Sequence, residues 1–83
     1  MNEIYYVYIL RSINSPEKVY VGYTNNLNRR LKEHNAGSQT YSKRYAPWEL
    51  ITYTGFSKRE TATKFEKHLK TPSGKAFLRK HLI

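Results

Sequence analysis

The sequence contains no cysteine, which excludes disulfide bonds and thiolate-bound zinc. Acidic residues are also scarce: six Asp and Glu stand against 15 Lys and Arg, so the formal net charge is +9 at pH 7. The longest apolar run, residues 4–10, is far shorter than the ~20 residues that a membrane-spanning helix needs. The first residues lack the basic flank of a signal peptide, so we expect a cytoplasmic location.

A chain of 83 residues has room for one domain, residues 1–83, with one modest hydrophobic core. A positive excess of this size attracts polyanions, and eight tyrosines lie among the basic residues, where they can stack on bases or contact sugars. Nucleic acid is therefore the leading partner. An anionic membrane surface is the rival, but no segment combines a broad apolar face with a basic one. The remaining interpretation is that the charge serves solubility alone.

Two strands are predicted at the start of the chain. Residues 4–11 are rich in tyrosine and β-branched residues, and residues 18–23 repeat this pattern after a short turn. The simplest arrangement is an antiparallel hairpin. Alternation places Tyr8 on the face opposite Val7 and Ile9, and Tyr8 stands beside Tyr20 if even-numbered positions pair with even-numbered ones.

A helix is predicted over residues 26–35, with Thr24 or Asn25 as its cap and Gly37 after its end. The stripe that this helix should turn inward consists of Leu27, Arg30, Leu31 and His34. A core helix has no reason to direct an arginine and a histidine inward unless something there needs them.

The second half of the chain begins with residues 36–47, which are predicted to form a long loop. Residues 48–56 should form a third strand, and the S-x-x-E pattern of Ser57 and Glu60 predicts a capping box that opens a helix to about residue 70. The inward stripe of that helix is Ala62, Phe65, Glu66 and Leu69. A short closing helix is expected over residues 75–82. The expected fold is α/β (α+β), a three-stranded antiparallel sheet flanked by helices in the order β-β-α-β-α-α.

Three of these elements direct polar side chains toward a common interior. The hairpin contributes Tyr8 and Tyr20, the first helix Arg30 and His34, and the second helix Glu66. Taken singly, each has an ordinary structural explanation, such as tyrosine packing or a buried ion pair between Glu66 and Arg30. Five such groups from three elements are harder to explain as separate accidents.

At these residues the chain resembles the GIY-YIG nuclease family. The run Tyr6-Val7-Tyr8 is similar to the family's GIY element, with Tyr6 in place of its first glycine, and Tyr20-Val21-Gly22 is similar to the YIG element. The similarity spans residues 5 to about 82 and is greatest to the short standalone members related to the N-terminal nuclease domain of UvrC.

Three further residues fit the family pattern. Arg30 and His34 follow Tyr20 at the distances at which the family places its arginine and its helical histidine, and Glu66 matches its metal-binding glutamate. Many larger relatives carry an asparagine after this glutamate's helix, whereas no asparagine follows Asn35 here. That supporting role is unfilled, or another residue such as Ser73 takes it.

The resemblance implies a metal-dependent endonuclease that hydrolyses DNA phosphodiester bonds, directed by DNA structure or of low sequence specificity, in repair or recombination. Glu66 would hold one divalent cation, Mg²⁺ or Mn²⁺, and Arg30 would clamp the scissile phosphate. Tyr20 would act as general base for the attacking water, with Tyr8 or His34 assisting proton transfer. We expect Gly22 to leave room for a helix or for the DNA backbone to approach.

Five basic or aromatic residues are predicted to contact the nucleic-acid backbone: Arg29, Lys32, Lys43, Arg44 and Tyr45. The alternative is that they form an ordinary solvated face. Two alternatives to the nuclease function stay open at this point. In one, the chain is a nucleic-acid-binding module with little or no turnover. In the other, it is a domain that needs a partner protein for targeting.

Overall fold

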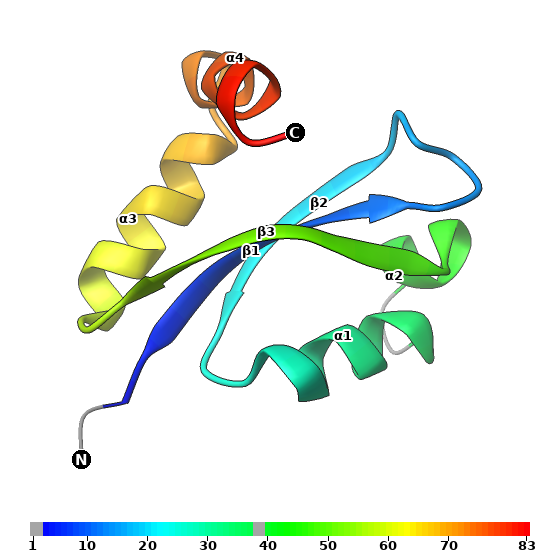
Figure 1. Ribbon diagram of the computed structural model, residues 1–83, viewed down its shortest axis with the longest axis horizontal. Helices are drawn as coiled ribbons and strands as arrows, with labels where there is room; N and C mark the ends of the chain where they lie inside the picture. The colour runs from blue at the N-terminus through cyan, green and yellow to red at the C-terminus, as the bar shows by residue number, and fades with distance from the viewer. Residues whose placement is uncertain (1–2, 38–39) are drawn as a thin grey trace.

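The computed structural model describes residues 3–37 and 40–83. The secondary-structure elements, in chain order, are β1 (Tyr5–Ser12), β2 (Val19–Thr24), α1 (Leu27–Asn35), α2 (Thr40–Tyr45), β3 (Trp48–Phe56), α3 (Arg59–Leu69) and α4 (Pro72–His81). They form the predicted α+β fold, in which helices flank a three-stranded antiparallel sheet (Figure 1). Within the described ranges, no helix is both long and apolar enough to cross a membrane.

The sheet has the order β2-β1-β3, so β1 lies in the centre and β2 at one edge. The register between β1 and β2 pairs Tyr8 with Gly22 and Leu10 with Tyr20. Even positions therefore pair with even positions, which brings Tyr8 and Tyr20 to the same face of the sheet. On the other side of β1, the pairing with β3 shifts between Ile9 and Leu10.

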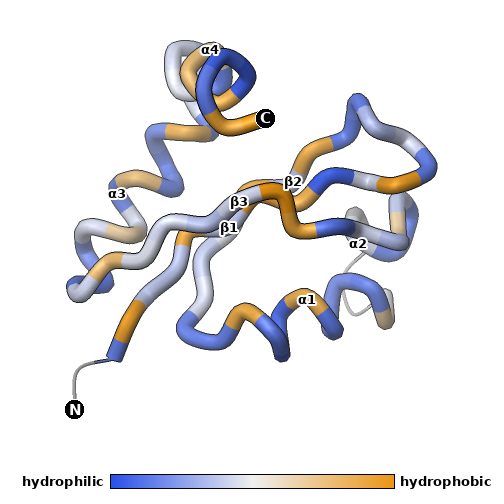
Figure 2. Tube along the Cα trace, viewed as in Figure 1, coloured by the Kyte–Doolittle hydropathy of each residue, from blue (hydrophilic) through white to orange (hydrophobic). Residues whose placement is uncertain are grey.

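Each face of the sheet carries its own hydrophobic cluster, because side chains alternate along the strands. One cluster joins Val7 and Ile9 to buried residues of α3 and α4, and the other joins Tyr8 and Leu10 to Trp48. Figure 2 shows the apolar stretches of the strands meeting in the middle of the sheet, whereas α1 is largely hydrophilic. Tyr8 and Tyr20 lie on the second face, which α1 covers, whereas α3 and α4 pack against the first face.

Helix α1 begins one residue later than predicted, and its cap is neither Thr24 nor Asn25. The Asn26 side chain accepts a hydrogen bond from the Arg29 backbone N–H at 3.0 Å. Thr24 is instead the last residue of β2, where its hydroxyl accepts the Asn26 backbone N–H at 3.1 Å. The end of the helix is as predicted: Gly37 has φ 78°, in the left-handed region that glycine adopts without a steric penalty.

The prediction of an uninterrupted loop over residues 36–47 is wrong, because α2 lies within it. This helix is short and carries no apolar stripe, so periodicity does not reveal it. Its Ser42 is fully buried, and the Ser42 backbone oxygen accepts the Trp48 indole N–H at 2.8 Å. The segment is therefore tied to the second hydrophobic cluster through Trp48.

The capping box predicted for α3 is also wrong. The helix begins at Arg59 with Lys58 at the N-cap and no side-chain capping bond, so Ser57 lies one residue too far upstream. Helix α4 begins earlier than predicted, at Pro72, where the Thr71 hydroxyl accepts the Gly74 backbone N–H at 3.1 Å. Pro72 occupies the first turn of this helix, where its missing N–H costs nothing.

Candidate active site

Tyr8 lies at the centre of the site, on the central strand, with 2% of its surface exposed. Its hydroxyl lies 3.3 Å from Nε of Arg30 and 2.9 Å from Nε2 of His34. Because a guanidinium can only donate, the Tyr8 oxygen accepts the bond from Arg30. Its own proton is then directed to His34, so the three side chains form one hydrogen-bonded chain from Arg30 through Tyr8 to His34.

His34 closes this chain from inside the protein, with 0% of its surface exposed. Burial, and next the positive charge of Arg30, lower the His34 pKa, so the ring is neutral at pH 7. The bond from Tyr8 to Nε2 assigns the ring proton to Nδ1, and this atom has no hydrogen-bond partner in residues 3–37 and 40–83. A histidine in this position does not contact a substrate; it fixes the Tyr8 hydroxyl.

The chemistry open to Tyr8 is limited by the same burial. Burial is the main cause that raises the Tyr8 pKa to about 12, and the hydrogen bond from Arg30 offsets only part of it. The phenol therefore keeps its proton at neutral pH and does not act as a base. Tyr8 positions Arg30 and the ring beside it.

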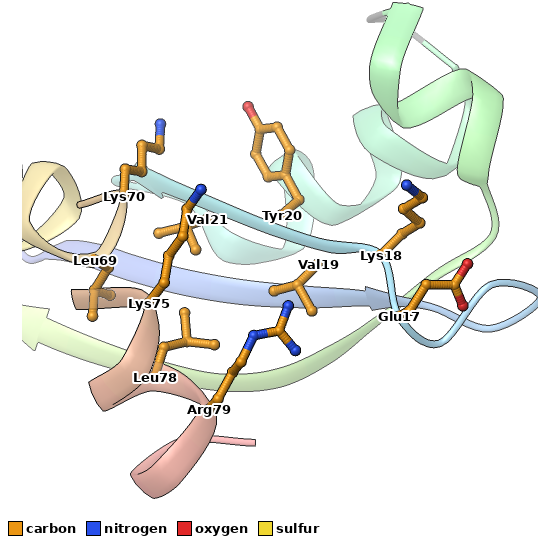
Figure 3. A pocket seen from close by; sticks show the side chains of 10 residues that line it. All are labelled: Glu17, Lys18, Val19, Tyr20, Val21, Leu69, Lys70, Lys75, Leu78 and Arg79. Carbon is orange, nitrogen blue, oxygen red and sulfur yellow. The ribbon is translucent and has the colours of Figure 1, made fainter. Parts of the chain in front are cut away.

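That neighbouring ring belongs to Tyr20, on the edge strand β2. The two tyrosine rings are stacked, with centroids 6.3 Å apart and an interplanar angle of 25°, and the Tyr20 ring lies 4.6 Å from that of His34. Tyr20 is only half-buried. In Figure 3 its hydroxyl points away from β2, on the same side as the Lys70 amine. Of the two tyrosines, Tyr20 is the one that can meet a substrate.

Gly22 makes room for Tyr8, and this corrects the prediction that it accommodates a helix or DNA. A Cβ atom at Gly22 would lie 2.5 Å from the Tyr8 hydroxyl oxygen and 2.7 Å from the ring carbon that carries it. Only glycine at this register position lets the phenol of Tyr8 cross the strand and reach His34.

Arg30 is held from two sides. Its Nε donates to Tyr8, and its terminal nitrogen lies 2.9 Å from Oε1 of Glu33. Burial by itself would lower the Arg30 pKa, but the hydrogen bonds to Tyr8 and Glu33 raise it overall, so the guanidinium keeps its charge. Arg30 also lines a polar pocket of about 450 Å³ together with Arg29 and Arg59. Three guanidinium groups around one hollow suit a phosphate.

Glu66 reaches the same region from α3. Its side chain is 16% exposed and pairs with Lys70 at 3.1 Å, while its negative charge is near enough to raise the pKa of Tyr8. The alternative of a buried ion pair between Glu66 and Arg30 is wrong, because Arg30 pairs with Glu33. The structure thus brings Tyr8, Tyr20, Arg30 and His34 into direct contact and places Glu66 within electrostatic reach.

The donor set around Glu66 limits which metal it can bind. Within the described ranges, no three His, Cys, Asp or Glu residues cluster as a metal site. A transition metal that needs several protein ligands therefore has no cage here. A hard cation that keeps most of its water and binds one carboxylate together with substrate phosphates does fit.

The residues predicted to contact nucleic acid lie on two helices of the second face. Arg29 and Lys32 are exposed on α1, and Lys43 and Arg44 are exposed on α2. Tyr45 is half-buried, with cations on its ring: Lys18 at 5.3 Å and Arg44 at 5.4 Å from its centroid.

Other basic residues near the site were not predicted from the sequence, namely Lys18, Arg59, Lys70, Lys75 and Arg79. The four-residue spacing of Lys75 and Arg79 on one helix was the signal that could have revealed two of them.

Comparison with known proteins places this geometry in a family. The model of the GIY-YIG catalytic domain matches residues 4–80. A UPF0213 protein from Haloquadratum walsbyi is 38% identical over 72 residues, which cover 86% of this chain and 79% of that protein. The solution NMR structure of a UPF0213 protein from Bacillus halodurans superposes with a TM-score of 0.55 at 30% identity, covering 93% of this chain and 83% of that one.

Larger proteins contain a segment that is similar to this chain. The structure-specific endonuclease subunit SLX1 homolog of Giardia intestinalis is 40% identical over 65 residues, which cover 74% of this chain but only 18% of that relative. SLX1 of Debaryomyces hansenii is 35% identical over 77 residues, again with only 22% of its length covered. Because the family model spans nearly the whole chain, the chain belongs to the GIY-YIG family of nuclease catalytic domains.

Proposed function

We propose that this protein is a metal-dependent endonuclease that hydrolyses DNA phosphodiester bonds and selects its substrate by structure rather than by sequence. One observation carries the proposal: Tyr20, Arg30 and Glu66 arrive from three elements, with Tyr20 and Arg30 in contact with a buried Tyr8–His34 pair and Glu66 within electrostatic reach of Tyr8. The net charge of +9 supplies the attraction to a polyanion.

Hydrolysis of a phosphodiester requires a deprotonated water, neutralised phosphoryl oxygens and help for the departing oxygen. Tyr20 takes the proton of the attacking water, because it is the tyrosine whose hydroxyl is directed outward. Arg30 donates to the phosphoryl oxygens, which accumulate charge in the transition state, and Tyr8 holds its Nε while Glu33 holds its terminal nitrogen. A guanidinium fixed at two points is organised before the substrate arrives.

Glu66 would hold the divalent cation, Mg²⁺ or Mn²⁺, with the ion's remaining positions left to water and phosphate oxygens. The bound ion would neutralise charge on the phosphoryl group and the leaving oxygen. Lys70 donates to Glu66 at 3.1 Å, and it would be free to contact substrate phosphates if the carboxylate held the cation.

Selection by DNA structure is supported by the relatives. The SLX1 proteins are named as structure-specific endonuclease subunits. We extend to this chain a role on branched or discontinuous DNA, as arises in repair or recombination, and the use of a protein partner for targeting. The small body offers few surfaces for reading a sequence, which agrees with this assignment.

The test is cleavage of nicked, branched, single-stranded and duplex DNA by purified protein with Mg²⁺, Mn²⁺ or EDTA. We expect metal-dependent cleavage that is strongest on discontinuous DNA and is lost in Glu66→Ala. Glu60→Ala is the matched control, because Glu60 is an exposed carboxylate on the same helix and should cleave as the wild type does.

Cleavage that persists in EDTA or in Glu66→Ala would contradict the role of Glu66. Tight binding without cleavage of any substrate would replace the proposal with the nucleic-acid-binding module. Cleavage that is seen only when a partner protein is added would support the proposed enzymatic function and assign the targeting of the enzyme to that partner.

A further inference from the structure

A second hollow lies beside the site, between the edge strand β2 and helix α4. Its volume is about 470 Å³ (Figure 3). Tyr20 also lines it, although its ring lies on the opposite face of the sheet from Val19 and Val21; because β2 is an edge strand, the groove and the site adjoin around that edge. The groove is lined by Glu17, Lys18, Val19, Tyr20, Val21, Leu69, Lys70, Lys75, Leu78 and Arg79.

The groove combines an apolar floor with a cationic rim. Val19, Val21 and Leu78 form part of the floor, and they belong to or pack against the first hydrophobic cluster. The rim carries four cations against the single acidic residue Glu17. In Figure 3 the Lys75 and Arg79 side chains extend from α4 toward β2, over the floor rather than away from it.

This combination matches the chemistry of a nucleotide, which has an apolar ring face and an anionic phosphate. Base rings pack on apolar and aromatic side chains, and Lys and Arg take phosphates. The volume falls within the range of about 300–1,000 Å³ that small-molecule sites occupy, so the groove suits one nucleotide rather than a duplex end. A base reaches such a floor only when it is unpaired, because pairing keeps it in the stack.

We propose that the groove between β2 and α4 is a subsite for one unpaired nucleotide of the DNA strand, next to the scissile phosphate. Its base lies on Val19, Val21 and Leu78, and its phosphates contact Lys75 and Arg79. The assignment rests on the proposed nuclease function for the position of the scissile phosphate. The subsite would also explain why the enzyme prefers a discontinuous strand to an intact duplex.

The experiment measures binding without cleavage, so that it does not depend on turnover. Methyl ¹³C shifts of the wild-type protein are followed while a six-nucleotide single strand of DNA is added in EDTA. We expect the largest shifts at Val19, Val21 and Leu78. The double variant Lys75→Ala, Arg79→Ala should lose these shifts, bind at least tenfold more weakly, and show a salt slope reduced by about 1.4, since each lost single-strand phosphate contact removes about 0.7.

The matched control is the double variant Lys64→Ala, Lys80→Ala. It removes two positive charges from α3 and α4 at exposed positions that do not line the groove. It should keep the methyl shifts and bind within about threefold of the wild type. Thermal unfolding of both double variants checks that the helices remain folded.

Three results would overturn the subsite. One is a binding titration that leaves the three methyl groups unshifted. Another is equal weakening by both double variants, which would mean that only net charge matters. The third is an equal methyl response to a poly-glutamate peptide, which would reassign the groove to an acidic protein segment. Methyl shifts without cleavage under any condition would support the nucleotide subsite and contradict the proposed nuclease function. Cleavage without methyl shifts would support the nuclease function and contradict the subsite.

Discussion

At the scale of single residues, burial gives two tyrosines on neighbouring strands different chemistry. Tyr8 is 2% exposed, its pKa is raised to about 12, and its hydroxyl is occupied by Arg30 and His34. Tyr20 is stacked on it but only half-buried, on the edge strand β2. The different roles proposed for the two tyrosines therefore follow from their places in the sheet, not from the residue type.

Gly22→Ala tests the space that Tyr8 occupies. The new Cβ would collide with the Tyr8 phenol, so we expect a loss of about 1–3 kcal/mol in the free energy of unfolding and a large fall in cleavage rate. Urea unfolding and single-turnover cleavage measure the two effects. Gly55→Ala is the control, since the nearest atom to its new Cβ belongs to the exposed side chain of Ile4, at 3.1 Å instead of 2.5 Å. Equal effects at Gly22 and Gly55 would contradict the account of Gly22.

His34 makes stability depend on pH in a defined direction. Its folded-state pKa is lowered, so below about pH 6.5 the unfolded chain binds a proton that the folded chain rejects. The free energy of unfolding should therefore fall as the pH drops from 7 to 5, with a slope of at most about 1.4 kcal/mol per pH unit from this residue. In urea unfolding, His34→Gln should flatten that slope, whereas the exposed His68→Gln should retain it. A slope unchanged in His34→Gln would refute the neutral buried ring.

At the scale of elements, the sequence predicted those helices and strands whose positions follow from local residue patterns. Alternation located β1, β2 and β3 to within one residue at each end, and the third strand has the predicted bounds. Periodicity located α1 and α3. Helix α2 was not predicted, because its six residues carry no stripe and its link to the core is a contact made by Trp48. The predicted capping box does not form, because helix α3 begins at Arg59 and its N-cap is Lys58, one residue after Ser57.

Asn26, which caps α1 in the structure, and Ser57, which the sequence pattern predicts as a cap of α3, can be compared directly by mutation. Asn26→Ala should cost about 1 kcal/mol of the free energy of unfolding, because its side chain caps the Arg29 N–H. Ser57→Ala should cost less than about 0.5 kcal/mol, since no side chain caps α3. Chemical denaturation of both variants decides between them. A larger loss at Ser57 than at Asn26 would show that the sequence pattern was right and the observed caps wrong.

At the scale of the whole molecule, the sequence predicted which side chains come together better than how they contact one another. Family resemblance together with inward stripes identified Tyr8, Tyr20, Arg30, His34 and Glu66. The roles of Gly22 and Lys70 were not visible, since they depend on which atoms meet across strands and helices. The groove between β2 and α4 joins residues from the first third of the chain to residues near its end, so no local pattern describes it.

The central claim is that Tyr20 performs proton transfer in a site held by Tyr8 and His34. It is tested most directly by the single-turnover rate of DNA cleavage with saturating Mg²⁺ or Mn²⁺, comparing the wild type with Tyr20→Phe. Tyr53→Phe is the matched control, because it removes another tyrosine hydroxyl from the sheet at a position 53% exposed that does not line the pocket of Arg29, Arg30 and Arg59. The account predicts a fall of at least about 100-fold for Tyr20→Phe, the range of general-base contributions, and less than about threefold for Tyr53→Phe. A Tyr20→Phe protein that is folded and cleaves at the wild-type rate would contradict it.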